Sequence, residues 1–215
     1  MTRIQKFNIE DVCNFHQEGC LRIDDVRRSP GKGVKGKMRR RILLTGPPGC
    51  GKTTVVRKVA DILRDGVSGF YTEDIRDVKK QRIGFRVVTL DGHSGELAGK
   101  ISGRGPRVGS YRVNVESFER VALPSLKIEE GRILIIDEIG KMECCSEEFV
   151  RSVEKAFEAD IAILATIPLR GGGSFIESVR RRQNMETILV ARENREALPE
   201  RLAAMLSSLP KGPDG

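Results

Sequence analysis

The sequence of 215 residues lacks any apolar run that approaches the roughly 20 residues needed to cross a membrane. Its first residues, Met1-Thr-Arg-Ile-Gln-Lys, are not followed by an apolar signal core, which argues against secretion. The five cysteines are odd in number and include an adjacent pair, so they do not indicate a disulfide framework and suit a reducing compartment better. We therefore expect a globular, cytoplasmic protein without a membrane partner.

The positive charge of the sequence lies mainly near its N-terminus. The net charge is +8, and residues 1–41 contain eleven Lys/Arg against five Asp/Glu, so this part carries +6 and the rest only +2. A basic arm of this kind can contact nucleic acid or an anionic lipid surface. Lys and Gly alternate in residues 31–37 without an aromatic side chain to stack on bases, so we favour a solvated leader over a nucleic-acid contact.

Three zones follow from the distribution of charge, Gly and Pro. Residues 1–39 form a basic leader that we expect to be disordered, and Met38 offers a shorter start that keeps every motif. Residues 40–208 form one domain, which is large enough for a buried core. Residues 209–215 form a flexible tail rich in Gly and Pro. The sequence does not determine the oligomeric state, and a monomer is compatible with it.

The most specific pattern is Gly46, four residues, then Gly51-Lys52-Thr53, placed between a short apolar strand and a helix. The glycines, Gly49 included, let the backbone curl so that its N–H groups point inward, which predicts an anion site at the start of the helix. Lys52 would reach the β- and γ-phosphates, and Thr53 would offer its hydroxyl to Mg²⁺. The pattern predicts a P-loop that binds a nucleoside triphosphate, with Mg²⁺ as cofactor.

A second pattern places two carboxylates after the apolar run 133–136. Asp137 would lie beside the P-loop and hold Mg²⁺ through a water, so the predicted metal ligands are Thr53 and Asp137. Glu138 would polarise the attacking water, an arrangement typical of hydrolases rather than small-molecule kinases. Thr166 ends another apolar strand, where it would either sense the γ-phosphate and hold the lytic water or be an ordinary β-branched strand end. The predicted catalytic residues are Lys52, Glu138 and Thr166.

Alternation of apolar and polar residues predicts strands that alternate with helices, and hence a mostly parallel sheet covered on both faces. The predicted strands are Arg41–Thr45, Val67–Asp74, Ile83–Leu90, Tyr111–Val115, Arg132–Ile136, Ile161–Thr166 and Glu186–Val190. The predicted helices are Gly51–Arg64, Glu116–Leu126, one that begins after a Ser146 N-cap, Phe175–Arg182 and Arg195–Leu206. In the first helix, residues Val55, Val56, Val59, Ile62 and Leu63 would face the core.

Other residues offer weaker candidates for function. Arg104, Arg107 and Arg170 lie in Gly-rich loops and could each neutralise transition-state charge. Cys13, His16 and Cys20 invite a zinc interpretation, but three loosely spaced ligands without a fourth make it weak. The segment 191–195 follows the last strand, where loops often line the nucleobase pocket, and it lacks the Asn-Lys-x-Asp motif that reads guanine.

The sequence resembles the P-loop nucleoside-triphosphatases of the thermophile and cancer-related type over about residues 40–195. Four stretches carry the resemblance: residues 45–54, residues 69–73 with 82–85, residues 108–111 with 113–115, and the string Ile-Asp-Glu-Ile-Gly-Lys-Met-Glu at 136–143. The resemblance implies an α/β fold with a RecA-like, mostly parallel sheet, helices on both faces and an added antiparallel strand pair. It also implies slow hydrolysis of ATP, GTP and pyrimidine triphosphates.

The resemblance further implies two sets of nucleotide contacts, while residues 71–73 would lie near the site. The first set is Gly46, Pro47, Pro48, Gly49, Cys50, Gly51, Lys52, Thr53 and Thr54, in which Cys50 acts as a spacer. The second set is Ile133, Leu134, Ile135, Ile136, Asp137, Glu138, Ile139 and Gly140.

These patterns together predict Mg²⁺-dependent hydrolysis of nucleoside 5'-triphosphates with broad base tolerance. Two alternatives stay open. A nucleotide or nucleoside kinase would need an acceptor pocket, which Thr72, Glu73 and Arg82 could supply. A nucleic-acid-associated ATPase would use the basic leader.

Overall fold

The computed structural model describes residues 39–100 and 105–208. Several sequence-based predictions fall outside these residues: the basic leader up to residue 38 with Cys13, His16, Cys20 and Met38, the loop residue Arg104, and the tail 209–215. No helix in the described ranges is long and apolar enough to pass through a lipid bilayer.

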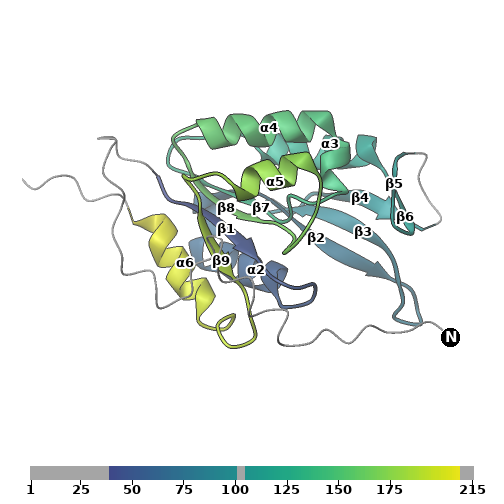
Figure 1. Ribbon diagram of the computed structural model, residues 1–215, viewed down its shortest axis with the longest axis horizontal. Coiled ribbons are helices and arrows are strands. Elements are labelled where there is room, and N and C mark those ends of the chain that lie inside the picture. The colour runs from purple at the N-terminus through teal and green to yellow at the C-terminus, as the bar shows by residue number, and fades with distance from the viewer. Residues whose placement is uncertain (1–38, 101–104, 209–215) are drawn as a thin grey trace, which may run out of the picture.

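Five parallel strands form one half of a mixed sheet. They lie side by side in the order β2, β7, β8, β1, β9 (Figure 1). Their bounds are Val67–Arg76 for β2, Ile133–Ile136 for β7, Ala162–Thr166 for β8, Arg41–Thr45 for β1 and Glu186–Leu189 for β9. Because all five run in the same direction, their carboxyl ends meet at one edge of the sheet, where ligands bind in open α/β sheets.

The other half of the sheet is antiparallel and is larger than the sequence indicated. The predicted pair is present as β2 with β3 (Arg82–Thr89), and β4 (Ser94–Gly99), β6 (Tyr111–Val113) and β5 (Arg107–Val108) extend it. Strand β4 escaped prediction because its sequence, Ser-Gly-Glu-Leu-Ala-Gly, is rich in residues of low strand propensity. It is held in place by pairing on both sides, with β3 and β6.

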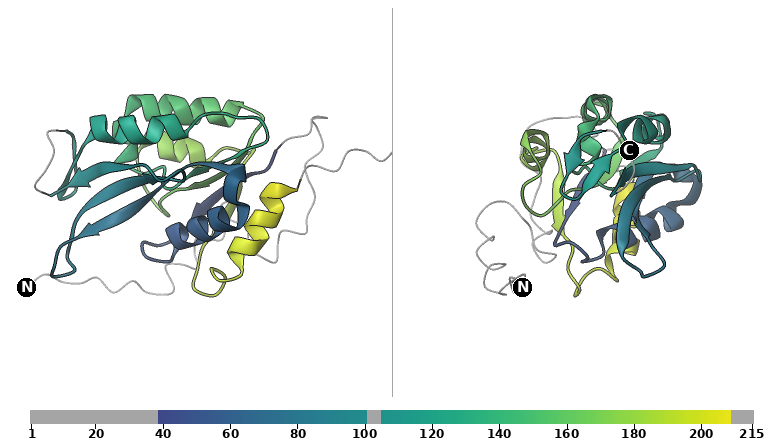
Figure 2. Two further views of the ribbon diagram at one scale, coloured as in Figure 1. Left: turned by 180° about the vertical axis from the view of Figure 1, so that it is seen from behind. Right: turned by 90° about the vertical axis from the view of Figure 1, so that its right-hand side faces the viewer.

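Helices cover both faces of the sheet, as predicted (Figures 1 and 2). On one face lie α2 (Lys52–Leu63) and α6 (Leu198–Ser207), and on the other lie α3 (Val115–Ser125), α4 (Glu147–Glu158) and α5 (Ser174–Arg180). Alternate residues of the parallel strands point to the two faces: Ile42 and Leu44 join the cluster under α2 and α6, whereas Leu43 joins the cluster under α3 and α4. This double burial makes the parallel strands continuously apolar.

Side-chain caps mark the start of helices α3 and α4. The Ser146 hydroxyl accepts a hydrogen bond from the Phe149 N–H at 2.9 Å, which confirms the predicted N-cap of α4. Asn114 caps α3 in the same way through the Ser117 N–H. In α2, Ile62 was predicted to face the core but is 48% exposed, because it lies in the last turn at the margin of the buried stripe. Ala60, which was not predicted to face the core, is buried.

Candidate active site

The loop between β1 and α2 has the curled form that the P-loop pattern predicts. Gly49 and Gly51 have φ angles of 76° and 108°, which side chains rarely tolerate. A Cβ on Gly46 would come within 2.6 Å of the Val190 carbonyl oxygen, so that position requires close approach to the end of β9. The loop leads directly into α2, whose first N–H groups have no partners within the helix. The loop therefore offers an anion site at a helix N-terminus.

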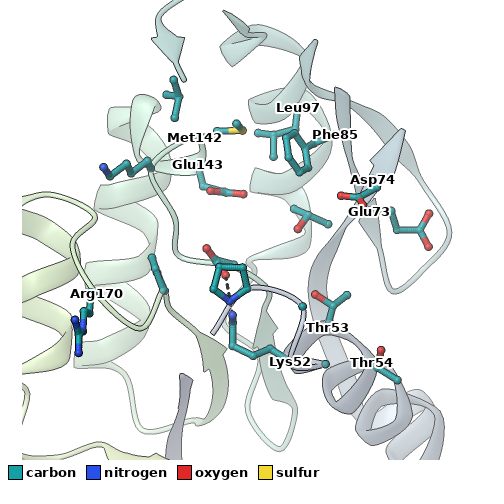
Figure 3. A pocket seen from close by; sticks show the side chains of 18 residues that line it. Lys52, Thr53, Thr54, Glu73, Asp74, Phe85, Leu97, Met142, Glu143 and Arg170 are labelled. Atoms are coloured by element: carbon teal, nitrogen blue, oxygen red, sulfur yellow. Dashed lines mark ion pairs between the residues drawn. The ribbon is translucent and has the colours of Figure 1, made fainter. Parts of the chain in front are cut away.

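Lys52 and Glu138 face each other at the mouth of this loop. The Lys52 ammonium forms an ion pair with Glu138 Oε2 at 3.8 Å (Figure 3). It also donates a hydrogen bond to the Gly46 carbonyl at 3.2 Å. The Lys52 side chain is 11% exposed and that of Glu138 is 31% exposed. Burial raises the pKa of Glu138, the charge of Lys52 lowers it, and the charge of Asp137 raises it further. The pair can therefore receive a phosphate and hold a water beside it.

Asp137 is buried and only half of its carboxylate is satisfied. The Thr166 hydroxyl donates to Asp137 Oδ1 at 2.6 Å, whereas Oδ2 has no hydrogen-bond partner among the described residues. Burial raises the pKa of Asp137, while the hydroxyls of Thr166 and Thr53 and the charge of Lys52 lower it. Ala165 of β8 is in register with Ile136 of β7, so the next residues, Thr166 and Asp137, lie side by side at the strand ends. On its other side Thr166 is in register with Leu44 of β1. Thr166 thus orients Asp137, and its contact with phosphate or water stays a prediction.

Asp137 and Thr53 are the residues that could hold Mg²⁺. The unpartnered Oδ2 of a buried carboxylate and a nearby threonine hydroxyl are oxygen donors of the kind that Mg²⁺ prefers. Within residues 39–100 and 105–208, no three His, Cys, Asp or Glu side chains gather to form a metal cage. A cation here would therefore need phosphate and water ligands as well, which fits a magnesium–nucleotide complex.

A cavity of about 560 Å³ is lined by Lys52, Thr53 and Glu138, whereas Asp137 and Thr166 are buried and are not among its lining residues. Of the predicted nucleotide contacts, it is lined by Pro48, Gly49, Gly51, Lys52, Thr53, Thr54 and Glu138. Ile133, Leu134, Ile135 and Ile136 do not line it, because strand β7 buries them on both faces of the sheet, and Ile139 is buried too. These residues place the two acids at the strand end, and their own contact with a nucleotide stays a prediction. Cys50 packs against the core under α2, in keeping with its predicted role as a spacer.

The candidate arginines are separated by the structure. Arg170 lines the cavity, whereas Arg107 lies in β5 and donates to the Gly109 carbonyl at 3.1 Å. Arg82, considered for an acceptor pocket, lies 2.7 Å from Asp74 and outside the cavity lining. Thr72 and Glu73 do line the cavity. Arg170 is thus the arginine that the described residues bring to the site.

Glu143 was not singled out as a site residue, although it ends the string 136–143. Its carboxyl group is buried in the cavity wall (Figure 3). A Cβ on Gly140 would come within 2.6 Å of Glu143 Oε2 and 3.0 Å of Glu138 Oε1, so a side chain at this position would require the Glu143 carboxylate to move. Burial, and next the charge of Glu138, raise the pKa of Glu143 to about 8. Its position in the resemblance string was the available sequence signal.

The raised pKa of Glu143 predicts a pH effect on stability. In an unfolded chain Glu titrates near about 4.3, so the folded state alone keeps the proton up to about 8. The contribution of Glu143 to folding is therefore full below about 4.3 and is lost as the pH rises through about 8. Glu143→Gln should reduce the drop in Tm between pH 6 and pH 9 by several degrees, since 1 kcal/mol corresponds to roughly 2–4 °C at this size. Thermal melts without nucleotide measure this drop in Tm, and the exposed Glu154→Gln is the control. A drop in Glu143→Gln equal to that of the unmodified chain would contradict the prediction.

The site geometry agrees with comparisons of the sequence. A family model described as NTPase matches residues 41–203. The chain belongs to this family. The predicted P-loop family, and with it the prediction of an enzyme that hydrolyses nucleoside triphosphates, is therefore confirmed at the level of the family.

The chain aligns with two relatives in the NTPase family over nearly the whole length of each relative. The chain is 40% identical over 188 residues to the "Cancer-related nucleoside-triphosphatase homolog" of Mus musculus, covering 80% of this chain and 98% of the mouse protein. It is 38% identical over 168 residues to "Nucleoside-triphosphatase THEP1" of Thermotoga maritima, covering 77% and 95%.

Two solved structures confirm the fold. The crystal structure of THEP1 from Aquifex aeolicus superposes with a TM-score of 0.71 at 34% identity, over 78% of this chain and 99% of that one. The solution structure of a human cancer-related nucleoside triphosphatase gives a TM-score of 0.67 at 38% identity, over 80% and 100%.

Proposed function

We propose that the protein hydrolyses nucleoside 5'-triphosphates, including ATP, GTP, CTP, UTP and TTP, to the diphosphate and phosphate, with Mg²⁺ and with broad base tolerance. The observation that carries the proposal is one cavity lined by the P-loop and the Lys52–Glu138 pair, with the half-satisfied Asp137 buried directly before Glu138 in the chain. The names of the family's relatives support the reaction class.

The role of each residue follows from its position in the site. Lys52 exchanges its bond with the Gly46 carbonyl for the β- and γ-phosphates, since a charged acceptor gives the stronger hydrogen bond. Glu138 accepts a hydrogen bond from water and aims it at the γ-phosphorus. Thr53 and Asp137, the latter oriented by Thr166, hold the cation. When bound there, Mg²⁺ would neutralise the negative charge that develops on the phosphate oxygens.

Base tolerance is supported by the loop after β9. The Asn194 side chain accepts from the Ala191 N–H at 3.0 Å and donates to the Leu189 carbonyl at 2.8 Å, so it stabilises its own turn. Arg195 pairs with Glu196 and lies along the P-loop, where a Cβ on Gly51 would be 3.4 Å from Arg195 Cδ. A guanidinium can stack on any base, whereas discrimination needs hydrogen bonds to base edges.

The proposal predicts the outcome of a nucleotide panel. Phosphate release from the five triphosphates should agree within about tenfold, a spread of about 1.4 kcal/mol, because the binding energy comes from the phosphates. Release should stop when EDTA replaces Mg²⁺ and return when Mg²⁺ is restored in excess. Selective release from one base would contradict base tolerance, full release in EDTA would contradict the metal, and no release from any nucleotide would contradict the function.

A further inference from the structure

The cavity continues beyond the catalytic acids into a second part, which we call the distal chamber. We define it by six of the residues that line the cavity, Thr72, Phe85, Leu97, Val108, Met142 and Glu143, and Lys141, next to Met142, lines the cavity as well. Phe85, Leu97 and Met142 lie together at the end opposite Lys52 and Thr53, with Glu143 between the two ends (Figure 3). Apart from Glu143 and Thr72, these walls are apolar. Hydrolysis requires only a water at Glu138, so these walls have no role in it.

A bound nucleotide would leave the distal chamber open. Its γ-phosphate end is marked by Lys52 and Glu138, at the entrance to the chamber. Its base end is expected near Arg195, which lies along Gly51 on the side of α2 and β9. The chamber residues belong instead to β2, β3, β4, β5 and the short helix η4 (Glu143–Cys145), or directly precede it. The chamber therefore adjoins the γ-phosphate end of the site and lies away from the expected base end.

The chamber walls favour an uncharged occupant with a ring or an apolar body. Phe85 is fixed in orientation, because the Arg82 guanidinium lies over its ring at 5.2 Å and Tyr111 packs edge-on at 5.0 Å. Phe85, Leu97, Val108 and Met142 are apolar and Glu143 is acidic, while the cationic residues that line the cavity are Lys52, Lys141 and Arg170. An anionic acceptor such as a nucleoside monophosphate would bring its phosphate against these apolar walls and Glu143, at a cost in desolvation.

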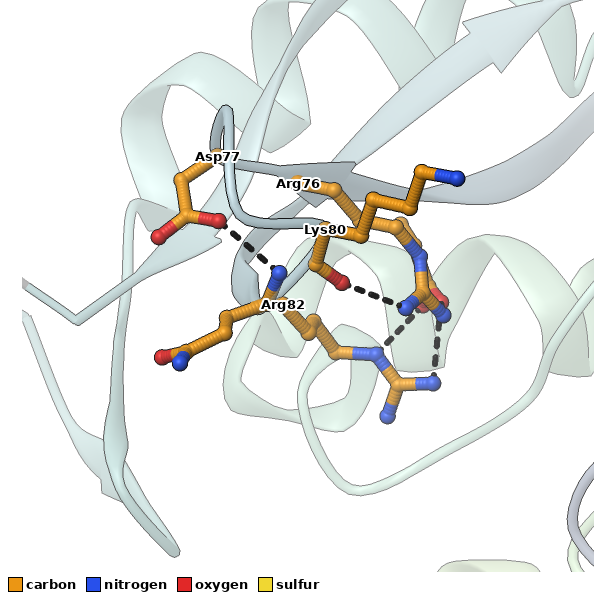
Figure 4. A network of polar contacts seen from close by, with 6 residues as sticks. Arg76, Asp77, Lys80 and Arg82 are labelled. Carbon is orange, nitrogen blue, oxygen red and sulfur yellow. Dashed lines mark hydrogen bonds and ion pairs between the residues drawn. The ribbon is translucent and has the colours of Figure 1, made fainter.

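Four arginines of α2, β2 and β3 are engaged with carboxylates. Asp74 binds Arg76 at 2.5 Å and Arg82 at 2.7 Å, and the Arg76 guanidinium also donates to the Lys80 carbonyl (Figure 4). In the same way Glu73 binds Arg57 at 3.0 Å and Arg86 at 2.6 Å. These four arginines therefore hold β2, β3 and α2 together instead of presenting an anion site to the chamber.

We propose that the distal chamber binds a second substrate, a neutral alcohol with an aromatic or apolar body, and that the protein transfers the γ-phosphoryl group to its hydroxyl. The inference rests on the proposed nucleotide site. The alcohol oxygen forms a bond to the γ-phosphorus, and the bond from that phosphorus to the β,γ-bridging oxygen breaks. The bonding electrons leave with the nucleoside diphosphate, and the hydroxyl proton passes to the Glu138 carboxylate. The products are a phosphate monoester and a nucleoside diphosphate, and hydrolysis is the same reaction with water.

The test measures where the γ-phosphate goes. The full chain is incubated with γ-labelled ATP and Mg²⁺ and with thymidine, adenosine, pyridoxine or benzyl alcohol, and thymidine monophosphate is the anionic counterpart. With at least one neutral alcohol, labelled ester should exceed labelled phosphate at least about tenfold, because a bound acceptor is positioned and water is not. Thymidine monophosphate should give no ester. Labelled phosphate alone in every reaction overturns the inference and leaves hydrolysis intact, whereas neither product overturns both proposals.

Variants locate the acceptor site. With the best alcohol, Phe85→Ala should lower the ratio of ester to phosphate at least about tenfold, the scale of losing a stacked ring contact. Met142→Ala, at a half-buried position, should lower it in the same direction if Phe85→Ala does not fold, as judged by thermal melting. Val78→Ala is the matched control, because Val78 is fully exposed in the turn between β2 and β3. An unchanged ratio in a folded chamber variant would place the acceptor elsewhere and overturn the assignment.

Discussion

Replacement of Glu138 by glutamine should leave nucleotide bound and lower phosphate release at least about a hundredfold, the scale of losing a positioned catalytic group. Glutamine keeps the shape of the side chain but cannot accept a proton or orient water as a carboxylate does. Binding should hold or tighten, because the γ-phosphate no longer faces a negative charge 3.8 Å from Lys52. The loss should therefore appear in kcat rather than in KM.

The measurement for Glu138→Gln pairs phosphate release with binding of a fluorescently labelled triphosphate, since the chain has no Trp to report binding. Glu154→Gln is the control, because it makes the same chemical change at an exposed position of α4. Turnover within about threefold of the unmodified chain, well below that scale, would remove Glu138 from the chemistry. Loss of both nucleotide binding and turnover would instead show that Glu138 is needed for the structure of the P-loop site.

The parts of the site that the sequence predicts are those encoded in contiguous stretches. The P-loop needs glycine at positions with positive φ, such as Gly49 and Gly51, followed at once by the Lys and Thr that serve the phosphates. Asp137 and Glu138 directly follow the buried strand β7, so the apolar run that predicts the strand also predicts their position at its end. The fold class follows for the same reason, because strands buried on both faces are apolar throughout.

The parts that escaped prediction depend on contacts between distant segments. Strand β4 exists because β3 and β6 flank it, and its own residues have low strand propensity. The distal chamber needs Phe85, Leu97 and Met142 to meet from separate elements, which no local pattern encodes. The hydrogen bond from the Thr166 hydroxyl to Asp137 depends on the register between β7 and β8, which the sequence alone does not give. Glu143 lies in a known string, yet its burial arises only when η4 folds back onto Gly140.

Replacement of Lys52 by alanine should weaken both binding and turnover, in contrast to the change at Glu138. A lost charge-assisted hydrogen bond of about 1.5–3 kcal/mol corresponds to roughly a ten- to hundredfold weaker nucleotide affinity. Turnover should fall by a further factor of about a hundred, because the same ammonium stabilises charge that grows on the β,γ-bridging oxygen. Lys155→Ala, at an exposed position of α4, is the matched control.

The Lys52→Ala variant should also carry a signature in its pH profile, which a purely structural defect would not produce. Lys52 lowers the pKa of Glu138, while burial and Asp137 raise it. Without the ammonium the pKa of Glu138 rises, so its carboxylate forms only at higher pH. Because the ionised form accepts the proton, the acidic limb of residual kcat/KM should move to higher pH in Lys52→Ala. That limb should stay in place in Lys155→Ala, and an unmoved limb in Lys52→Ala would show that ionisation of Glu138 does not limit the reaction.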